Sequence, residues 1–210
     1  MTALRRSATR ATHRRLRGMV LVIALVAMLA MALSGMALMR SVSATAAVGG
    51  NLGFWHTATS AGDAAIEDAV AALFGGVRIA DAATDDPTQG YFAAHQAGEG
   101  ARGIPRAMQT LANYPPQAPI IDAGNGNIVR YVIERMCLAA GPATPDNCNV
   151  VAVSDSPLSV SGGTIVPAPR VPLFRQTLRV DGPAGAVVFV QVWLADIPNR
   201  RRLSWRALAE

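Results

Sequence analysis

Residues 19–39 read MVLVIALVAMLAMALSGMALM, an apolar run without a charged residue that stops at Arg40. Coiled as an α-helix, this run would be roughly 31 Å long, which is about the thickness of the hydrocarbon core of a bilayer. Inside lipid every backbone N–H and C=O must be paired within the segment, so a membrane-spanning stretch of this kind has to be helical. The sequence therefore predicts a transmembrane helix over residues 19–40.

The positive charge of the chain is concentrated in front of this run. Residues 1–18 hold six arginines and no acid, so the 19 basic residues of the whole chain leave 19 − 6 = 13 against 14 acids for the remainder. Arginines beside a membrane span stay in the cytoplasm, which predicts a single-pass protein with a cytoplasmic amino end and residues 41–210 in a bacterial periplasm. Because the remainder has no excess of positive charge, we expect no nucleic-acid partner.

Three interpretations of the amino end remain open at this level. Ala44-Thr45-Ala46 offers a signal-peptidase site, but the apolar run is longer than the core of an ordinary secretory signal. A plain uncleaved anchor explains both the length and the charges. In the third interpretation the chain is cut between Gly18 and Met19 on the cytoplasmic side, which removes the arginines and leaves the whole apolar helix on the mature protein.

Residues 17–40, RGMVLVIALVAMLAMALSGMALMR, followed by SVSATAAVGGN and an alanine-rich stretch to about residue 70, resemble the amino terminus of PilX-type minor pilins of type IV pili. The resemblance implies a prepilin that is cut after Gly18 and methylated on the amino group of Met19. It also implies a protein of the bacterial inner membrane that is later incorporated into the pilus. The implied partners are other minor and major pilins, the prepilin peptidase, the inner-membrane assembly machinery and the lipid bilayer.

One position departs from the major pilins. They carry a glutamate at the fifth position after the cleavage glycine, where this chain has Ile23. The resemblance then favours an accessory subunit that primes assembly over a bulk filament subunit. Two alternatives stay open, namely a minor pseudopilin of a type II secretion system, whose tip subunit also lacks that glutamate, and a plain membrane-anchored periplasmic interaction domain.

The rest of the chain predicts an α+β, pilin-like fold. Alanines and an apolar stripe extend the helix through residues 41–75, with a break expected at Gly49, Gly50 and Gly53. Residues 76–210 form the periplasmic domain, which begins with an irregular stretch. Hairpin signals at Asn125-Gly126 and at residues 181–185 predict an antiparallel sheet of about four strands, packed on the helix, from residues 128–136, 150–153, 174–180 and 186–194.

Cys137 and Cys148 are the only cysteines of the chain. In an oxidising compartment they are expected to form a disulfide, with two buried thiols as the alternative.

The sequence does not predict an enzyme. His13, His56 and His95 occur in no metal-ligand spacing with one another, and no nucleophile motif is present. The acidic and amide residues at 122–127 fit a turn better than a calcium loop. We therefore expect neither a metal nor a cofactor. The arginine-rich tail at 199–206 is predicted to be a solvated edge strand, or alternatively a contact surface for neighbouring pilins with Trp205 as an anchor.

Overall fold

The computed structural model describes residues 16–153, 158–161, 163–167, 169–199 and 201–208. The chain divides into two compact units, the first ending at Leu52 and the second beginning at Gly53. Most of the predicted leader, residues 1–15, and Arg200 of the basic tail lie outside the described residues.

The first described element is the helix α1, Leu16–Phe74. It contains an apolar segment that is long enough to cross a membrane, as the sequence predicted. The predicted break was wrong, because Gly49, Gly50 and Gly53 are all helical. A helical glycine costs only about 1 kcal/mol relative to alanine, which is too little to interrupt a helix of 59 residues. At its end the helix stops where expected: Gly75 N–H donates to the Ala71 carbonyl, and Gly76 adopts φ 73°.

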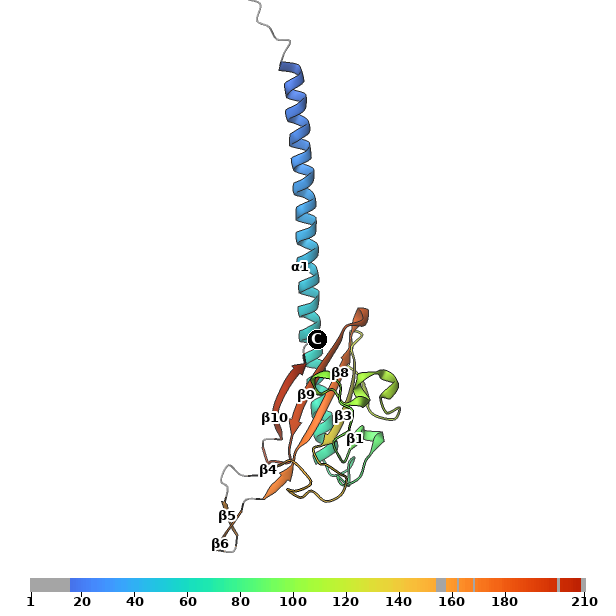
Figure 1. The fold of residues 1–210 in the computed structure, drawn as a ribbon, viewed down its shortest axis with the longest axis vertical. Helices are drawn as coiled ribbons and strands as arrows, with labels where there is room; N and C mark the ends of the chain where they lie inside the picture. Colours follow the sequence, from blue (N-terminus) through green and yellow to red (C-terminus); the bar gives the residue numbers. More distant parts are fainter. Residues whose placement is uncertain (1–15, 154–157, 162, 168, 200, 209–210) are drawn as a thin grey trace, which may run out of the picture. The chain divides into compact units, whose positions relative to one another are not determined.

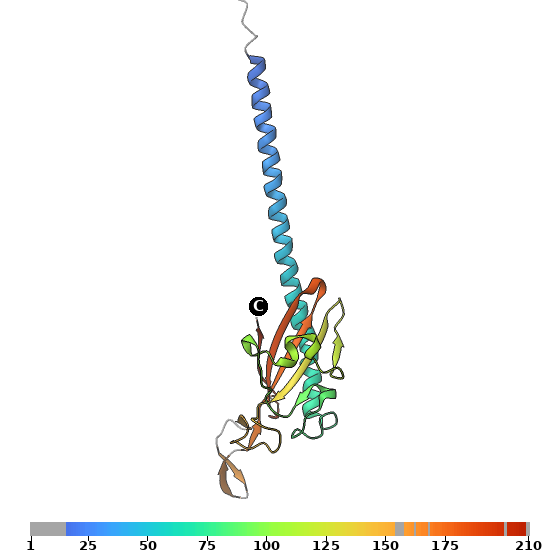
Figure 2. The same cartoon turned by 45° about the vertical axis from the view of Figure 1, so that its right-hand side comes forward.

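The second unit is built on a six-stranded sheet with the order β1-β3-β8-β9-β10, in which β2 also pairs with β3 (Figures 1 and 2). The strands are β1 Tyr91–Phe92, β2 Ile120–Asp122, β3 Ile128–Arg135, β8 Phe174–Asp181, β9 Val187–Leu194 and β10 Arg202–Leu208. The sheet is mixed and larger than predicted, because β1 runs parallel to β3 while the other pairs are antiparallel. A two-residue strand carries too short a pattern to be found in a sequence.

Both predicted hairpins are confirmed. β2 and β3 are joined through Asn125 and Gly126, at φ 53° and 77°, as a tight turn with two positive φ values requires. Asp122 accepts the Gly124 N–H at 2.9 Å, so the 122–127 segment is a turn. β8 and β9 pair over their whole length and are joined through the 3₁₀ turn η4, Pro183–Gly185.

The core of the second unit has three layers. Alanines of α1 pack against one face of the sheet, and their spacing of three or four residues places them on one stripe of the helix (Ala58, Ala61, Ala65, Ala69 and Ala72). The other face of the sheet is covered by the segment around α2, Arg106–Gln109, with Met108 and Tyr114 packed on Val132 and Phe189. The central strands β3, β8 and β9 are therefore mostly buried on both faces.

The remaining elements are short. The stretch that was predicted to be irregular contains three 3₁₀ turns, namely η1 Pro87–Gln89, η2 Ala101–Gly103 and η3 Leu111–Asn113. Two separate hairpin-like pairs follow β3, namely β4 Val150–Ala152 with β7 Arg170–Pro172, and β5 Leu158–Ser161 with β6 Thr164–Pro167. β4 confirms the strand expected near residue 150. Its predicted place in the main sheet was wrong, because β4 pairs with β7 in a separate two-stranded sheet.

Candidate functional site

The junction between Gly18 and Met19 lies in the first turns of α1. A Cβ built on Gly18 would meet no atom within 4 Å, so the described fold places no steric demand on this glycine. Met19 is 64% exposed. The packing of the described residues therefore does not require glycine at position 18.

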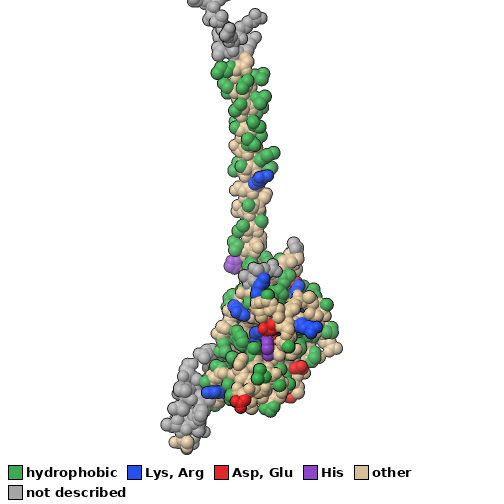
Figure 3. Space-filling model, in the orientation of Figure 1, with side chains coloured by type: hydrophobic (Ala, Val, Ile, Leu, Met, Phe, Trp, Pro, Cys, Tyr) green, Lys and Arg blue, Asp and Glu red, His purple; other side chains and the backbone are tan. Residues whose placement is uncertain are grey.

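The apolar segment of α1 forms an uncovered hydrophobic surface in the first unit. Its large side chains from Met19 to Met39 are 57–76% exposed, and Figure 3 shows hydrophobic side chains around this part of the helix. Soluble monomers rarely expose contiguous apolar patches above a few hundred Å². A helix that is apolar on all sides needs an apolar environment, which lipid or other apolar helices supply.

Cys137 and Cys148 are joined by a disulfide, as predicted. The two residues also form an antiparallel bridge, directly after β3 and shortly before β4. The bridge closes a short loop in which Leu138 is 85% exposed. This covalent closure links the end of the main sheet to the smaller β4–β7 pair.

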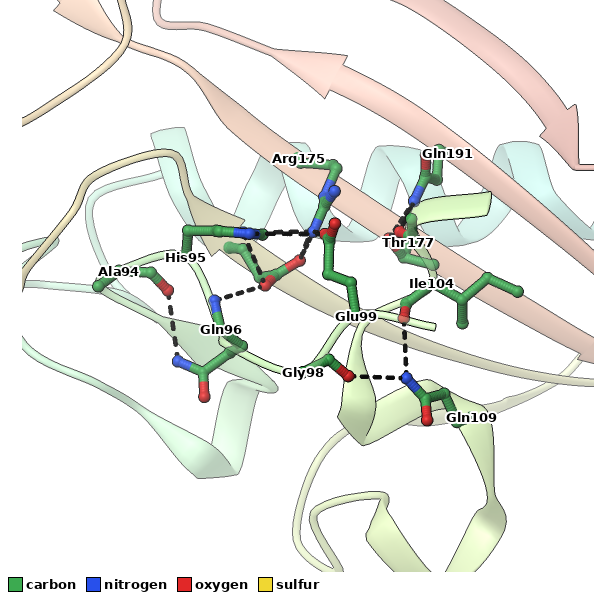
Figure 4. A network of polar contacts seen from close by, with 12 residues as sticks. Ala94, His95, Gln96, Gly98, Glu99, Ile104, Gln109, Arg175, Thr177 and Gln191 are labelled. Atoms are coloured by element: carbon green, nitrogen blue, oxygen red, sulfur yellow. Dashed lines mark hydrogen bonds and ion pairs between the residues drawn. The ribbon is translucent and has the colours of Figure 1, made fainter. Parts of the chain in front are cut away.

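A network of charged side chains lies between β3, β8 and the 93–103 segment (Figure 4). Glu134 of β3 is completely buried and accepts from Arg175 Nη2 at 2.6 Å and from the Gln96 N–H at 2.9 Å. Arg175 also pairs with Glu99, and His95 Nδ1 lies 3.5 Å from Glu134 Oε1. Burial opposes the charge of Arg175, but the two carboxylates outweigh this effect and raise the pKa of the guanidinium above its ordinary value.

The same network brings together three side chains of types that bind metals. Ligand atoms of His95, Glu99 and Glu134 lie within 4.8 Å of one another. The buried guanidinium of Arg175 already contacts both carboxylates and neutralises part of their charge. A divalent cation would have to displace it and leave a buried positive charge without its partners, which is costly. The arrangement is best explained as an ion-pair network that holds the 93–103 segment on the sheet.

A second polar cluster fixes the carboxyl end of α1 to the sheet. Asp68 accepts from Arg78 Nη1 at 2.6 Å and from the Tyr131 hydroxyl at 2.5 Å. Partial burial opposes ionisation of the Asp68 carboxyl, but the hydrogen bonds from Arg78 and Tyr131 and the charge of Arg78 outweigh this, so its pKa is lowered. Burial raises the pKa of Tyr131. The Asp68 carboxyl therefore stays ionised and the Tyr131 hydroxyl stays protonated, as the hydrogen bond between them requires.

Comparison of the chain with protein-family models, with curated protein sequences and with solved structures finds no match. Function must therefore be argued from the residues and their arrangement. Sequence reasoning singled out Gly18, Met19 and the two cysteines, but it missed Glu99, Glu134 and Arg175. Glu134 lies 41 positions from its partner Arg175, and Glu99 lies still further from it in the chain, so no local pattern links them.

Proposed function

We propose that the protein is a minor pilin of type IV pilus biogenesis. The chain would be inserted in the bacterial inner membrane with its arginine-rich leader in the cytoplasm and residues 41–210 in the periplasm. A prepilin peptidase would cut after Gly18, and the new amino group of Met19 would be methylated. The subunit would then join other minor and major pilins, help to prime assembly, and leave the membrane with the growing fibre.

The proposal rests on a difference in burial between the two parts of α1. Residues 19–39 present apolar side chains on all sides and bury none of the large ones, whereas residues 58–72 bury an alanine stripe against the sheet. A helix of this kind can be held in lipid by its first part and remain integral to a folded domain through its second part. Exchange of lipid for neighbouring apolar helices costs little, because the two environments are similarly apolar.

Ile23 supports an accessory role over a bulk one. It is 60% exposed and presents an alkyl side chain where a filament of major pilins needs a carboxylate to balance a neighbour's terminal amine. A buried charge without a partner costs several kcal/mol. A subunit without this carboxylate is better suited to the end of a fibre than to its interior. The same residue also suits the tip of a type II secretion pseudopilus, which is the second candidate.

The test is to replace Gly18 with phenylalanine and follow maturation in the native host by immunoblotting and amino-terminal sequencing. Since a side chain at Gly18 meets no atom of the described structure, the variant should fold and insert but keep its leader. Gly35→Val is the matched control, because Gly35 lies in the same helix and is equally free of neighbours. Normal maturation of the Gly18 variant would contradict the prepilin proposal.

A further inference from the structure

The last strand of the main sheet, β10, has an open edge. Among the described residues it pairs with β9 alone, and both cartoon views place it at the border of the sheet (Figures 1 and 2). Its seven residues include no proline. Every second N–H and C=O along this edge therefore points away from β9 and is available to another strand.

The two faces of β10 differ in chemistry. Trp205 is the register partner of Val192, whose side chain packs in the core beneath α1, so Trp205 lies on the α1 face of the sheet. It is nevertheless 51% exposed. Arg206 is the register partner of Gln191 and lies on the opposite face, where its Nη2 donates to Gln191 Oε1 at 2.8 Å. In the middle of β10, Trp205 thus lies on one face of the edge and Arg206 on the other.

The basic character continues beyond β10. Gln191 Nε2 donates to the Gly103 carbonyl at 2.6 Å, which brings η2 and its exposed Arg102 next to the same face. Within the described part of the chain, neither Arg102 nor Arg206 forms an ion pair with a carboxylate. The nearby carboxylate of Glu99 is already paired with Arg175.

On the α1 face, an open groove of about 730 Å³ lies beside the start of β10. It is lined by residues of α1 and of the β9–β10 connection (Glu67, Val70, Pro198, Asn199, Arg201 and Arg202). Arg202 is held there by Asp63 and Glu67.

We propose that β10 docks an extended segment of another protein in which acidic and apolar residues alternate. Successive side chains of an added strand point to opposite faces. One set would lie over Trp205, and the other would bring carboxylates to Arg206 and Arg102. This inference does not depend on the pilin proposal, since an anchored interaction domain would dock such a segment in the same way.

Two other occupants are disfavoured by charge. Pairing of β10 with β10 of a second copy would bring two sets of arginines into one small interface, where like charges repel. An anionic membrane surface would meet Asp63 and Glu67, which are exposed on the α1 face. An acidic and apolar strand satisfies the open backbone groups, the indole and the unpaired arginines together.

The experiment uses the full chain in phosphatidylcholine nanodiscs and a labelled seven-residue peptide of alternating glutamate and valine. A peptide of the same composition with its glutamates in one block is the probe control. Fluorescence anisotropy measures binding, and hydrogen–deuterium exchange measures protection of the β10 amides. We expect the alternating peptide to bind at least tenfold more tightly than the block peptide and to slow exchange in β10.

Trp205→Ala and Arg206→Glu should each weaken binding of the alternating peptide at least tenfold. Leu138→Ala and Arg170→Glu, which change exposed residues away from β10, should have little effect. The proposal is overturned by equal binding of the two peptides, by absent binding, or by equal losses in the control variants. Protection of β10 without peptide, either at high protein concentration or in phosphatidylglycerol discs, would assign the edge to a second copy or to the membrane instead.

Discussion

Glu134 and Arg175 are register partners on β3 and β8, and their charged groups meet at 2.6 Å with the carboxylate wholly buried. The pair sits beneath the segment that covers this face of the sheet, and Glu134 also receives the Gln96 N–H of that segment. A buried carboxylate therefore connects the sheet to its covering layer.

Glu134→Gln should lower the free energy of unfolding of the second unit by about 3 kcal/mol, because it leaves the buried Arg175 with one carboxylate instead of two. Asp196→Asn is the control, since among the described residues Asp196 makes an exposed ion pair with Arg201 alone, at 3.7 Å, and its loss should change stability by less than about 0.5 kcal/mol. Urea unfolding followed by near-UV circular dichroism measures both. Equal losses of unfolding free energy in the two variants would show that the buried Glu134–Arg175 pair stabilises the fold no more than an exposed ion pair does.

Asp68 makes the attachment of α1 to the sheet sensitive to acid. The pKa of Asp68 is lower in the folded protein than its ordinary 3.8, so its contribution to stability is complete above that value and is lost as the pH falls through the folded pKa. Melting temperatures between pH 2 and pH 7 should therefore fall less steeply with acid in Asp68→Asn than in the unchanged protein. The variant should also be less stable at pH 7. Parallel curves for the two proteins would contradict this role.

Gly182, at the end of β8, has no room for a side chain. A Cβ at this position would overlap the ring of Phe54 in α1. Gly182→Ala should therefore destabilise the protein by about 1–3 kcal/mol through overpacking. Phe54→Leu should restore part of the loss when combined with it, and thermal unfolding of the single and double variants measures this coupling. Gly62→Ala is the control, because the space around Gly62 is open. Gly185→Ala would not serve, because Gly185 has φ 79° and an alanine would be strained there.

The disulfide closes a loop between residues 11 positions apart. Replacing Cys137 and Cys148 together with serine should cost about 3 kcal/mol, as expected for a loop of this length. The double variant should be present at a lower level in the native host and should be cut sooner by protease. Unchanged abundance and protease resistance would show that the bridge is dispensable.

Much of this architecture follows from local sequence. The apolar run, the alanine stripe and the Asn125-Gly126 turn each carry a short-range signal, so the helix and both hairpins could be predicted. Strand β3 could be placed from the sequence, although neither of its two faces carries apolar side chains alone. The structure explains it, because β3 is covered on both faces, so Val132 and Glu134 are buried beneath the α2 segment and Tyr131 and Ile133 beneath α1.

The parts that sequence reasoning missed depend on distant residues. β1 is a two-residue strand that exists only because β3 offers an edge for it. The network of Glu99, Glu134 and Arg175 joins three segments that no motif connects, and His95 is an ordinary loop residue until the fold brings it there. Gly49, Gly50 and Gly53 show the opposite case, since their local cost of about 1 kcal/mol each does not interrupt a long helix.

Processing as a prepilin is tested most directly by the intact mass and the amino-terminal sequence of the protein purified from membranes of its own host. We expect a chain that starts at N-methylated Met19 and lacks all six arginines of the leader. A chain that retains Met1 would contradict it and leave an anchored domain. A chain that starts after Ala46 would contradict it as well, because the apolar helix would then be absent from the mature protein.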